Sequence, residues 1–334
     1  METIAYVSNR GIPFQQLFQL VPALAPFYTS AEANYDVIPI QTFVKNHWEI
    51  PFGCVALYLA GIFFGTKFMD KVDYKNIWDT RGVLAAWNAL LCIFSFTGAL
   101  RTVPHLLYNL KAQSFESTIC TPPDQEWGVG ATGLWVQLFI LSKIPELIDT
   151  VFIVQRKRPL IFLHWYHHVT VLLYCWHSYA TEASQALYFV AMNYSVHAVM
   201  CESTHLKYYQ AKSLIILSIL FSLVMAGFYH FHLISYLLYH MCTLDGYYCL
   251  MALKIKPPIP PVAITVFQIS QMVVGTFIQC AAMMYYSEEA GKCGVHYGNL
   301  VAGGLMYGSY FALFFQFAIK RFVLTPKKED KKVE

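Results

Sequence analysis

The sequence predicts an all-α integral membrane protein whose transmembrane helices, about seven in number, pack as a bundle. Of its 334 residues 57% are hydrophobic and only 13% are charged, whereas an average soluble domain has about 25% charged residues. Aromatic residues make up 16% of the chain, which fits aromatic belts at the two membrane interfaces. The formal net charge of +3 is too small to indicate nucleic-acid binding.

The first half of the chain has a mixed N-terminal arm, residues 1–49, followed by apolar runs of a length that can cross a bilayer. The predicted spans are about 50–68, 83–103, 130–154 and 160–179. Basic loops remain in the cytosol, and such loops follow the first span and, at 156–158, the third. The N-terminus is therefore expected in the lumen.

The second half continues with spans of about 186–200, 262–286 and 300–324. The multi-span domain thus covers residues 50–325, and residues 326–334 form a polar tail on the cytosolic side. An apolar run at 213–239 is also long enough to span, and it lies in an atypical segment, 201–245.

Two clusters of ionisable residues interrupt this apolar pattern. An ionisable residue at the centre of a membrane helix costs roughly 2.5–3.5 kcal/mol, so such groups normally face a cavity. On a helix, His164, His167 and His168 share one face because they stand at i, i+3 and i+4. In the preceding span Lys143, Glu146 and Thr150 share a face with Asp149 beside them. The predicted bundle therefore encloses a catalytic tunnel.

Four motifs carry a resemblance that covers most of residues 50–325. They are KIPELIDT at 143–150, HWYHH at 164–168, MNYSVHAVM at 192–200 and TVFQISQ at 265–271. In this order they resemble the ELO family of fatty acid elongases, the very-long-chain 3-oxoacyl-CoA synthases. HWYHHVTVLLY is most similar to the subgroup that elongates saturated and monounsaturated chains. The resemblance implies an acyltransferase that condenses a long-chain acyl-CoA with malonyl-CoA, releasing CoA and CO2.

The resemblance also implies roles for individual residues. The middle histidine of the box, His167, would form an acyl-imidazole, and His197 would assist malonyl binding and decarboxylation. His164 and His168 would orient the reacting groups or donate hydrogen bonds to them. The expected supporting polar network is Lys143, Glu146, Asp149, Asn193, Gln268 and Gln271. Cations expected to meet CoA phosphates are Arg156, Lys157, Arg158, Lys254 and Lys256.

Two other classes of function remain open. A membrane di-iron desaturase or hydroxylase also uses an H-x-x-H-H pattern, but its two irons need about eight histidines in several boxes, and this chain has one box. A non-catalytic lipid transporter would explain the spans but not the histidines. No bound cofactor or metal is expected, and acyl-CoA and malonyl-CoA are the expected substrates.

Cysteine placement and the C-terminus complete the expectations. Cys120 and Cys293 fall in the two loops assigned to the oxidising lumen, so a disulfide is predicted between them. The final residues, KKVE, resemble a retrieval signal of endoplasmic reticulum membrane proteins, which works only from the cytosol.

Expected partners are membrane lipid and the reductases and dehydratase of the elongation cycle, with a homodimer left open. The segment 201–245 departs from the family pattern, and it is expected to add no net crossing.

Overall fold

The structure, a computed structural model, describes residues 6–7, 13–73, 78–198, 261–287 and 293–319. In these ranges it is almost entirely helical, as the sequence predicts. The exception is an antiparallel pair of two-residue strands, β1 (Tyr6–Val7) and β2 (Pro13–Phe14). The segment 201–245, the cations Lys254 and Lys256, and the tail lie outside the described residues.

Short helices precede the long ones. The N-terminal arm contains α1 (Leu17–Leu20), the 3-10 helix η1 (Pro22–Phe27), α2 (Ser30–Ala33) and α3 (Ile38–Asn46). The helices that follow are α4 (Glu49–Lys71), α5 (Arg81–Ala112), α6 (Phe115–Cys120), α7 (Pro123–Glu126), α8 (Gly130–Ser142), the 3-10 helix η3 (Pro145–Leu147), α9 (Ile148–Gln155), α10 (Phe162–Ala180), α11 (Ala186–Ala198), α15 (Pro261–Tyr285) and α16 (Tyr297–Ala318).

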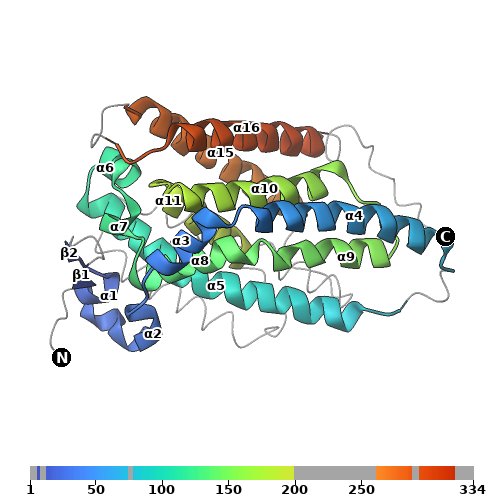
Figure 1. Ribbon diagram of the computed structural model, residues 1–334, viewed down its shortest axis with the longest axis horizontal. Coiled ribbons are helices and arrows are strands. Elements are labelled where there is room, and N and C mark those ends of the chain that lie inside the picture. Colours follow the sequence, from blue (N-terminus) through green and yellow to red (C-terminus); the bar gives the residue numbers. More distant parts are fainter. Residues whose placement is uncertain (1–5, 8–12, 74–77, 199–260, 288–292, 320–334) are drawn as a thin grey trace, which may run out of the picture.

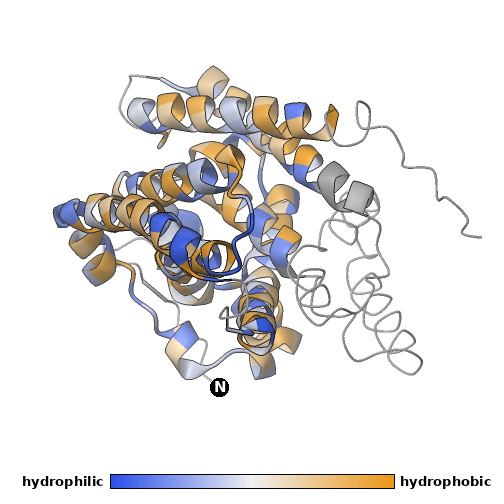
Figure 2. Ribbon diagram, turned by 90° about the vertical axis from the view of Figure 1, so that its right-hand side faces the viewer, coloured by the Kyte–Doolittle hydropathy of each residue, from blue (hydrophilic) through white to orange (hydrophobic). Residues whose placement is uncertain are grey.

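The surface of the bundle is that of a membrane protein. Within the described ranges, α4, α5 and α16 are long and apolar enough to cross a membrane. Large apolar side chains of α4 point outward; Leu57, for example, is 76% exposed. Such continuous exposed apolar surface is rare on soluble monomers, and a lipid surface accounts for it. Figure 2, which looks along the bundle, shows hydrophobic residues spread over the helices. The total of seven spans stays a prediction.

The helices contact one another in a closed ring. Going round it, α5 packs on α8, and α10 lies between α8 and α16; α15 and α11 then lead back to α5. The first long helix, α4, lies outside this ring against α9 and α10. The inward faces of the ring helices can therefore form an enclosed site, which is where the polar clusters lie.

The third predicted span is not one continuous helix, which corrects the expectation for 130–154. It is divided into α8, η3 and α9, and the break lies at Pro145. Proline has no N–H with which to bond the carbonyl four residues back. The chain instead forms tighter turns, with the Ile144 N–H donating to the Leu141 carbonyl at 3.2 Å. This break separates Lys143 from the helix that carries Asp149 and Thr150.

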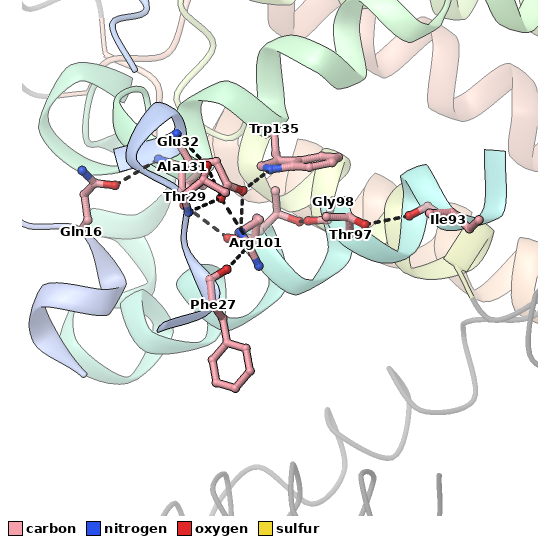
Figure 3. Close-up of polar contacts among 12 residues, drawn as sticks. Gln16, Phe27, Thr29, Glu32, Ile93, Thr97, Gly98, Arg101, Ala131 and Trp135 are labelled. Atoms are coloured by element: carbon pink, nitrogen blue, oxygen red, sulfur yellow. Dashed lines mark hydrogen bonds and ion pairs between the residues drawn. The ribbon is translucent and has the colours of Figure 1, made fainter. Parts of the chain in front are cut away.

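One buried ion pair ties the N-terminal arm to the ring (Figure 3). Arg101 of α5 donates from Nε to Glu32 Oε1 of α2 at 2.8 Å. Trp135 of α8 donates from Nε1 to the same oxygen at 2.9 Å, and the Thr29 N–H donates to Glu32 Oε2 at 2.9 Å. Both charged side chains are nearly buried, at 11% and 9% exposure. The arm is thus a fixed part of the structure.

The Glu32 carboxylate predicts an acid-sensitive contact. Burial alone would raise the pKa of Glu32, but the bonds from Arg101, Thr29 and Trp135 lower it from 4.5 to about 2. Because the folded pKa lies below the unfolded value, the stabilisation is complete above about pH 4.5 and is lost as the pH falls toward 2. We expect Glu32→Gln to lower the unfolding temperature at neutral pH and to flatten its decline in acid. Thermal unfolding of detergent-purified protein over a pH series measures this.

The control for that series is Glu116→Gln, because Glu116 is an exposed carboxylate on α6. Its unfolding temperature should follow that of the wild type at every pH. If the unfolding temperature of Glu32→Gln also follows that of the wild type at every pH, the Glu32–Arg101 pair does not stabilise the fold.

Cys120 and Cys293 form the disulfide expected from their placement, and 173 residues separate them in the sequence. The bond joins the end of α6 to the segment that precedes α16. Beside it, the Gly294 N–H donates to the Cys120 carbonyl at 2.7 Å. The two connections it ties lie at the same end of the bundle as the N-terminal arm (Figure 1).

Candidate active site

The histidine box occupies the first turns of α10, which begins at Phe162 after the extended Ile161. The rings of His164 and His168 lie 4.6 Å apart, and those of His167 and His168 lie 5.7 Å apart, both pairs edge to face. His168 is buried and the other two are half-buried. Three imidazoles therefore share one face of α10, as their spacing predicts.

A chain of hydroxyl groups orients His164. The Thr150 Oγ1 lies 2.9 Å from His164 Nε2 and 2.7 Å from the Tyr58 hydroxyl of α4. Thr150 was expected beside Lys143 and Glu146, and the structure instead bonds it to the histidine box. The break at Pro145 places it on a separate helix. Tyr58 carries no signal in the sequence, because only the packing of α4 on α9 and α10 brings it to this position.

His167 packs against Tyr310 of α16. Their ring centroids lie 5.1 Å apart, and the Tyr310 hydroxyl donates to the His167 carbonyl at 3.2 Å. The same hydroxyl lies 2.6 Å from Thr170 Oγ1. Tyr310 therefore fixes both the ring and the backbone of the central histidine, although the sequence offers no motif around it.

Lys143 and Glu146 form a buried ion pair. Lys143 Nζ donates to the two carboxylate oxygens of Glu146 at 2.8 and 3.0 Å, and Ser142 Oγ donates to Oε1 at 2.7 Å. The ammonium also lies 3.9 Å from the centroid of the Phe139 ring. The side chains are 4% and 15% exposed. A buried pair is weak evidence for stability, since desolvation offsets the attraction, so its presence here favours a functional role.

A small hollow lies beside this ion pair. Its polar lining includes Lys143, Glu146, Asp149, Asn193 and His197. These side chains come from three segments: the turn around η3, then α9, and then α11. Asp149 accepts a hydrogen bond from the Trp87 indole at 2.6 Å. Separate helices therefore bring one lysine, two carboxylates, an amide and an imidazole to a single hollow.

The two clusters lie within electrostatic range of each other. Glu146 interacts with both Lys143 and His197, and His167 interacts with Lys143, Glu146 and His197. The structure thus unites the histidine box, the Lys143–Glu146 pair and the histidine of α11, which the sequence places on three different helices.

Other predicted site residues lie elsewhere or lack a described position. Gln271 is buried and Gln268 half-buried on α15, and neither lines the hollow. Arg156 and Lys157 bond to the segment that joins α4 to α5, through Thr80 Oγ1 and the Val72 carbonyl. Arg158 is exposed. These three cations are at the end of α9, the end of the bundle opposite the N-terminal arm (Figure 1).

Metal binding is not apparent in the part of the chain that the structure describes. There, no group of three or more His, Cys, Asp or Glu side chains is arranged to hold a metal ion. The di-iron alternative therefore gains no support from this region.

The arrangement suits acyl transfer. An imidazole held by a neighbour can act as a nucleophile, and a cation and amide donors can stabilise the oxyanion or enolate that develops during condensation. Low local dielectric strengthens each of these interactions. The hollow offers the cation of Lys143, the amide of Asn193 and the imidazole of His197. The box histidines lie outside its lining, and His167 is within electrostatic range of Lys143, Glu146 and His197.

Comparisons with known proteins identify fatty acid elongases as relatives. The sequence model of the ELO (GNS1/SUR4) family matches residues 43–331. The chain is 35% identical over 291 residues to "Putative fatty acid elongase 3" of Caenorhabditis elegans, covering 86% of this chain and 74% of that protein. It is 34% identical to "Very long chain fatty acid elongase 6" of Drosophila melanogaster, covering 85% and 75%. With "Very long chain fatty acid elongase 6" of Gallus gallus it shares 34% identity, covering 84% and 87%.

Proposed function

Because this chain belongs to the ELO family, it is a multi-pass membrane enzyme of fatty acid elongation, and we propose that it is a very-long-chain 3-oxoacyl-CoA synthase. This enzyme condenses a long-chain acyl-CoA with malonyl-CoA to a 3-oxoacyl-CoA two carbons longer. The observation that carries the mechanism is the buried Lys143–Glu146 pair beside the three-histidine box. The reaction needs no bound cofactor, since both substrates arrive as thioesters.

In the first half-reaction, a neutral nitrogen of His167 attacks the acyl thioester carbonyl. The bond to sulfur breaks, CoA leaves as the thiol after taking up a proton, and an acyl-imidazole remains. In the second, malonyl-CoA loses CO2 and its α-carbon attacks the acyl-imidazole carbonyl. The bond between the acyl carbon and the imidazole nitrogen breaks, the 3-oxoacyl-CoA departs, and the imidazole is regenerated by taking up a proton.

The neighbouring groups support these steps. His197 assists decarboxylation from α11, with Asn193 one turn away as a carbonyl donor. His164, held by Thr150, and His168 orient the box. The Lys143 cation stabilises negative charge that develops on a carbonyl oxygen. The cations at the end of α9 meet the CoA phosphates.

The test of this function is incubation of purified protein with a panel of acyl-CoAs and labelled malonyl-CoA. We expect one CO2 released for each labelled 3-oxoacyl-CoA formed. A desaturase would instead yield a new double bond and carry iron, and a transporter would bind acyl-CoA without product. Without malonyl-CoA, continued acyl-CoA turnover beyond one equivalent of the protein would contradict the proposal.

We also propose residence in the endoplasmic reticulum membrane, with a lumenal N-terminus and a cytosolic tail that ends in Lys331-Lys332-Val333-Glu334. The reductases and dehydratase of the cycle would be its partners there, and a homodimer is compatible with it.

A protease should digest a C-terminal tag in sealed microsomes, since the segment 201–245 adds no net crossing. A protected tag would mean that the segment spans, and the retrieval signal would then be excluded. Deleting 201–245 should preserve or improve elongase activity.

A further inference from the structure

Two hydroxyl groups and an imidazole form a continuous hydrogen-bonded chain from α4 to the histidine box. Tyr58 lies on α4, Thr150 on α9 and His164 on α10, and α4 packs against both of the other helices (Figure 1). Thr150 Oγ1 is 2.7 Å from the Tyr58 hydroxyl and 2.9 Å from His164 Nε2. Tyr58 and Thr150 are only 8% and 2% exposed. Because water has little access to the two hydroxyls, each must find its hydrogen-bond partners within the protein.

The direction of the two bonds follows from the number of hydrogens. Each hydroxyl carries one hydrogen, and in the part of the chain that the structure describes Thr150 Oγ1 is the only hydrogen-bond partner of the Tyr58 hydroxyl. If Thr150 donated to Tyr58, the Tyr58 hydrogen would be buried without an acceptor, at the full cost of its desolvation. Tyr58 therefore donates to Thr150, and Thr150 donates its own hydrogen to His164 Nε2.

This direction selects one form of the His164 ring. A neutral imidazole has one nitrogen that donates and one that accepts, whereas an imidazolium donates from both. Because Nε2 receives the Thr150 hydrogen, the ring is neutral and its own hydrogen lies on Nδ1. No described residue other than Thr150 forms a hydrogen bond with the ring, and the side chain is half-buried. The Nδ1–H group is therefore available to a substrate at the box.

We propose that Tyr58 is a positioning residue, which fixes the hydrogen of His164 on Nδ1 through Thr150 and so makes this imidazole a hydrogen-bond donor to the reacting carbonyl. This inference rests on the proposed function. Attack by His167 on the thioester places negative charge on the carbonyl oxygen, and a donor fixed in advance stabilises that charge. The same chain prevents His164 from acting as a base, because its accepting nitrogen is already occupied.

Tyr58→Phe tests the hydroxyl alone, because it keeps the ring whose centroid lies 6.2 Å from that of His168. Without the Tyr58 hydrogen, Thr150 is free to accept from His164 Nε2 as well as to donate to it, so both forms of the ring become populated. We expect kcat to fall about tenfold, the effect of one hydrogen bond, while KM for both substrates stays unchanged. An unchanged kcat would overturn the proposal.

The matched control is Tyr188→Phe, which makes the same change at another tyrosine–threonine pair. The Tyr188 hydroxyl on α11 lies 2.5 Å from Thr118 Oγ1 on α6, at the end of the bundle that carries the disulfide (Figure 1). Its kcat should equal that of the wild type. The unfolding temperatures of both variants should be compared, so that a loss of stability is not taken for a loss of positioning.

Thr150 provides a test that a purely structural role of Tyr58 would not pass. Thr150→Val removes the hydroxyl that links Tyr58 to His164, and it should lower kcat at least as much as Tyr58→Phe does. Combining the two substitutions should lower kcat no further, because the tyrosine acts only through the threonine. Thr150→Ser, which restores the hydroxyl, should recover most of the rate. Additive losses in the double variant would mean that Tyr58 acts by another route.

Two amides at position 164 distinguish a donor from a base. An asparagine places an amide N–H where Nδ1 lies, a glutamine places it where Nε2 lies, and neither amide is a base. His164→Gln should lower kcat by about 10²-fold or more, as the loss of an oxyanion donor does elsewhere, and His164→Asn should retain a clearly higher rate. Equal inactivity of the two variants would contradict the donor role.

The position of the hydrogen can also be measured without turnover. In ¹⁵N NMR of histidine-labelled protein, the His164 signals are those lost in His164→Asn, and they should show an unprotonated Nε2 in the wild type and a mixture of forms in Tyr58→Phe. A wild-type His164 with its hydrogen on Nε2 would overturn the inference, whatever the activity. A wild type that elongates no acyl-CoA would instead overturn the proposed function, so the two failures are distinguishable.

Discussion

His167→Ala should abolish condensation, lowering the rate by at least about 10³-fold, as the loss of a covalent nucleophile does elsewhere. The remaining imidazoles of the box should not replace it, because His167 is the one whose ring and carbonyl Tyr310 contacts among the described residues. With acyl-CoA alone, the wild type should release CoA in a burst close to one equivalent and retain the acyl group. His167→Ala should show no burst. Labelled acyl-CoA and a thiol assay measure both.

His177→Ala is the control for this experiment, because His177 lies on the same helix but contacts Trp48 and His296 at the far end. It should retain the burst and most of the turnover. Near-wild-type condensation by His167→Ala would contradict the acyl-imidazole, and a lost burst in both variants would point to a folding defect in α10.

Removal of the disulfide should cause the largest loss of stability. In the loop-entropy model, a bond that closes a loop of 173 residues lowers the entropy of the unfolded chain. This raises the free energy of the unfolded state by about 5 kcal/mol. We expect Cys120→Ser with Cys293→Ser to lower the unfolding temperature substantially while the spectrum stays helical. Reductant should also lower the unfolding temperature of the wild type, and it should not lower that of the double variant any further.

Cys54→Ser is the control, because Cys54 is a free and half-exposed thiol on α4. It should leave the unfolding temperature unchanged. Non-reducing peptide mapping that finds Cys120 and Cys293 as free thiols would contradict the bond. It would also remove the argument that places both connections in the lumen.

Part of the site was predictable because its information is local. The face shared by His164, His167 and His168 follows from helical spacing alone, and each of the predicted spans contains helix where the structure describes it. Apolar composition decides these features, since every backbone group inside a bilayer must be satisfied within its own helix. The motifs likewise indicated elongation chemistry before any contact was known.

The break in the third span was a missed local signal. Pro145 stands between Lys143 and Glu146, and a proline removes a helical hydrogen bond. Prolines are tolerated in transmembrane helices, so the residue alone did not require a break. The structure shows that the 3-10 turns there direct the ion pair toward the hollow and Thr150 toward His164.

The sequence by itself determined that this chain is a helical membrane elongase with a histidine box. Only the tertiary structure decided which side chains meet: Tyr310 with His167, Tyr58 with Thr150, and Glu32 with Arg101, which is 69 residues away. Hydrophobic pattern reports whether a residue faces lipid or protein, and it is the same for many arrangements of the helices. The partner of a buried group depends on how neighbouring helices cross and how deeply their side chains interlock, which no single segment encodes.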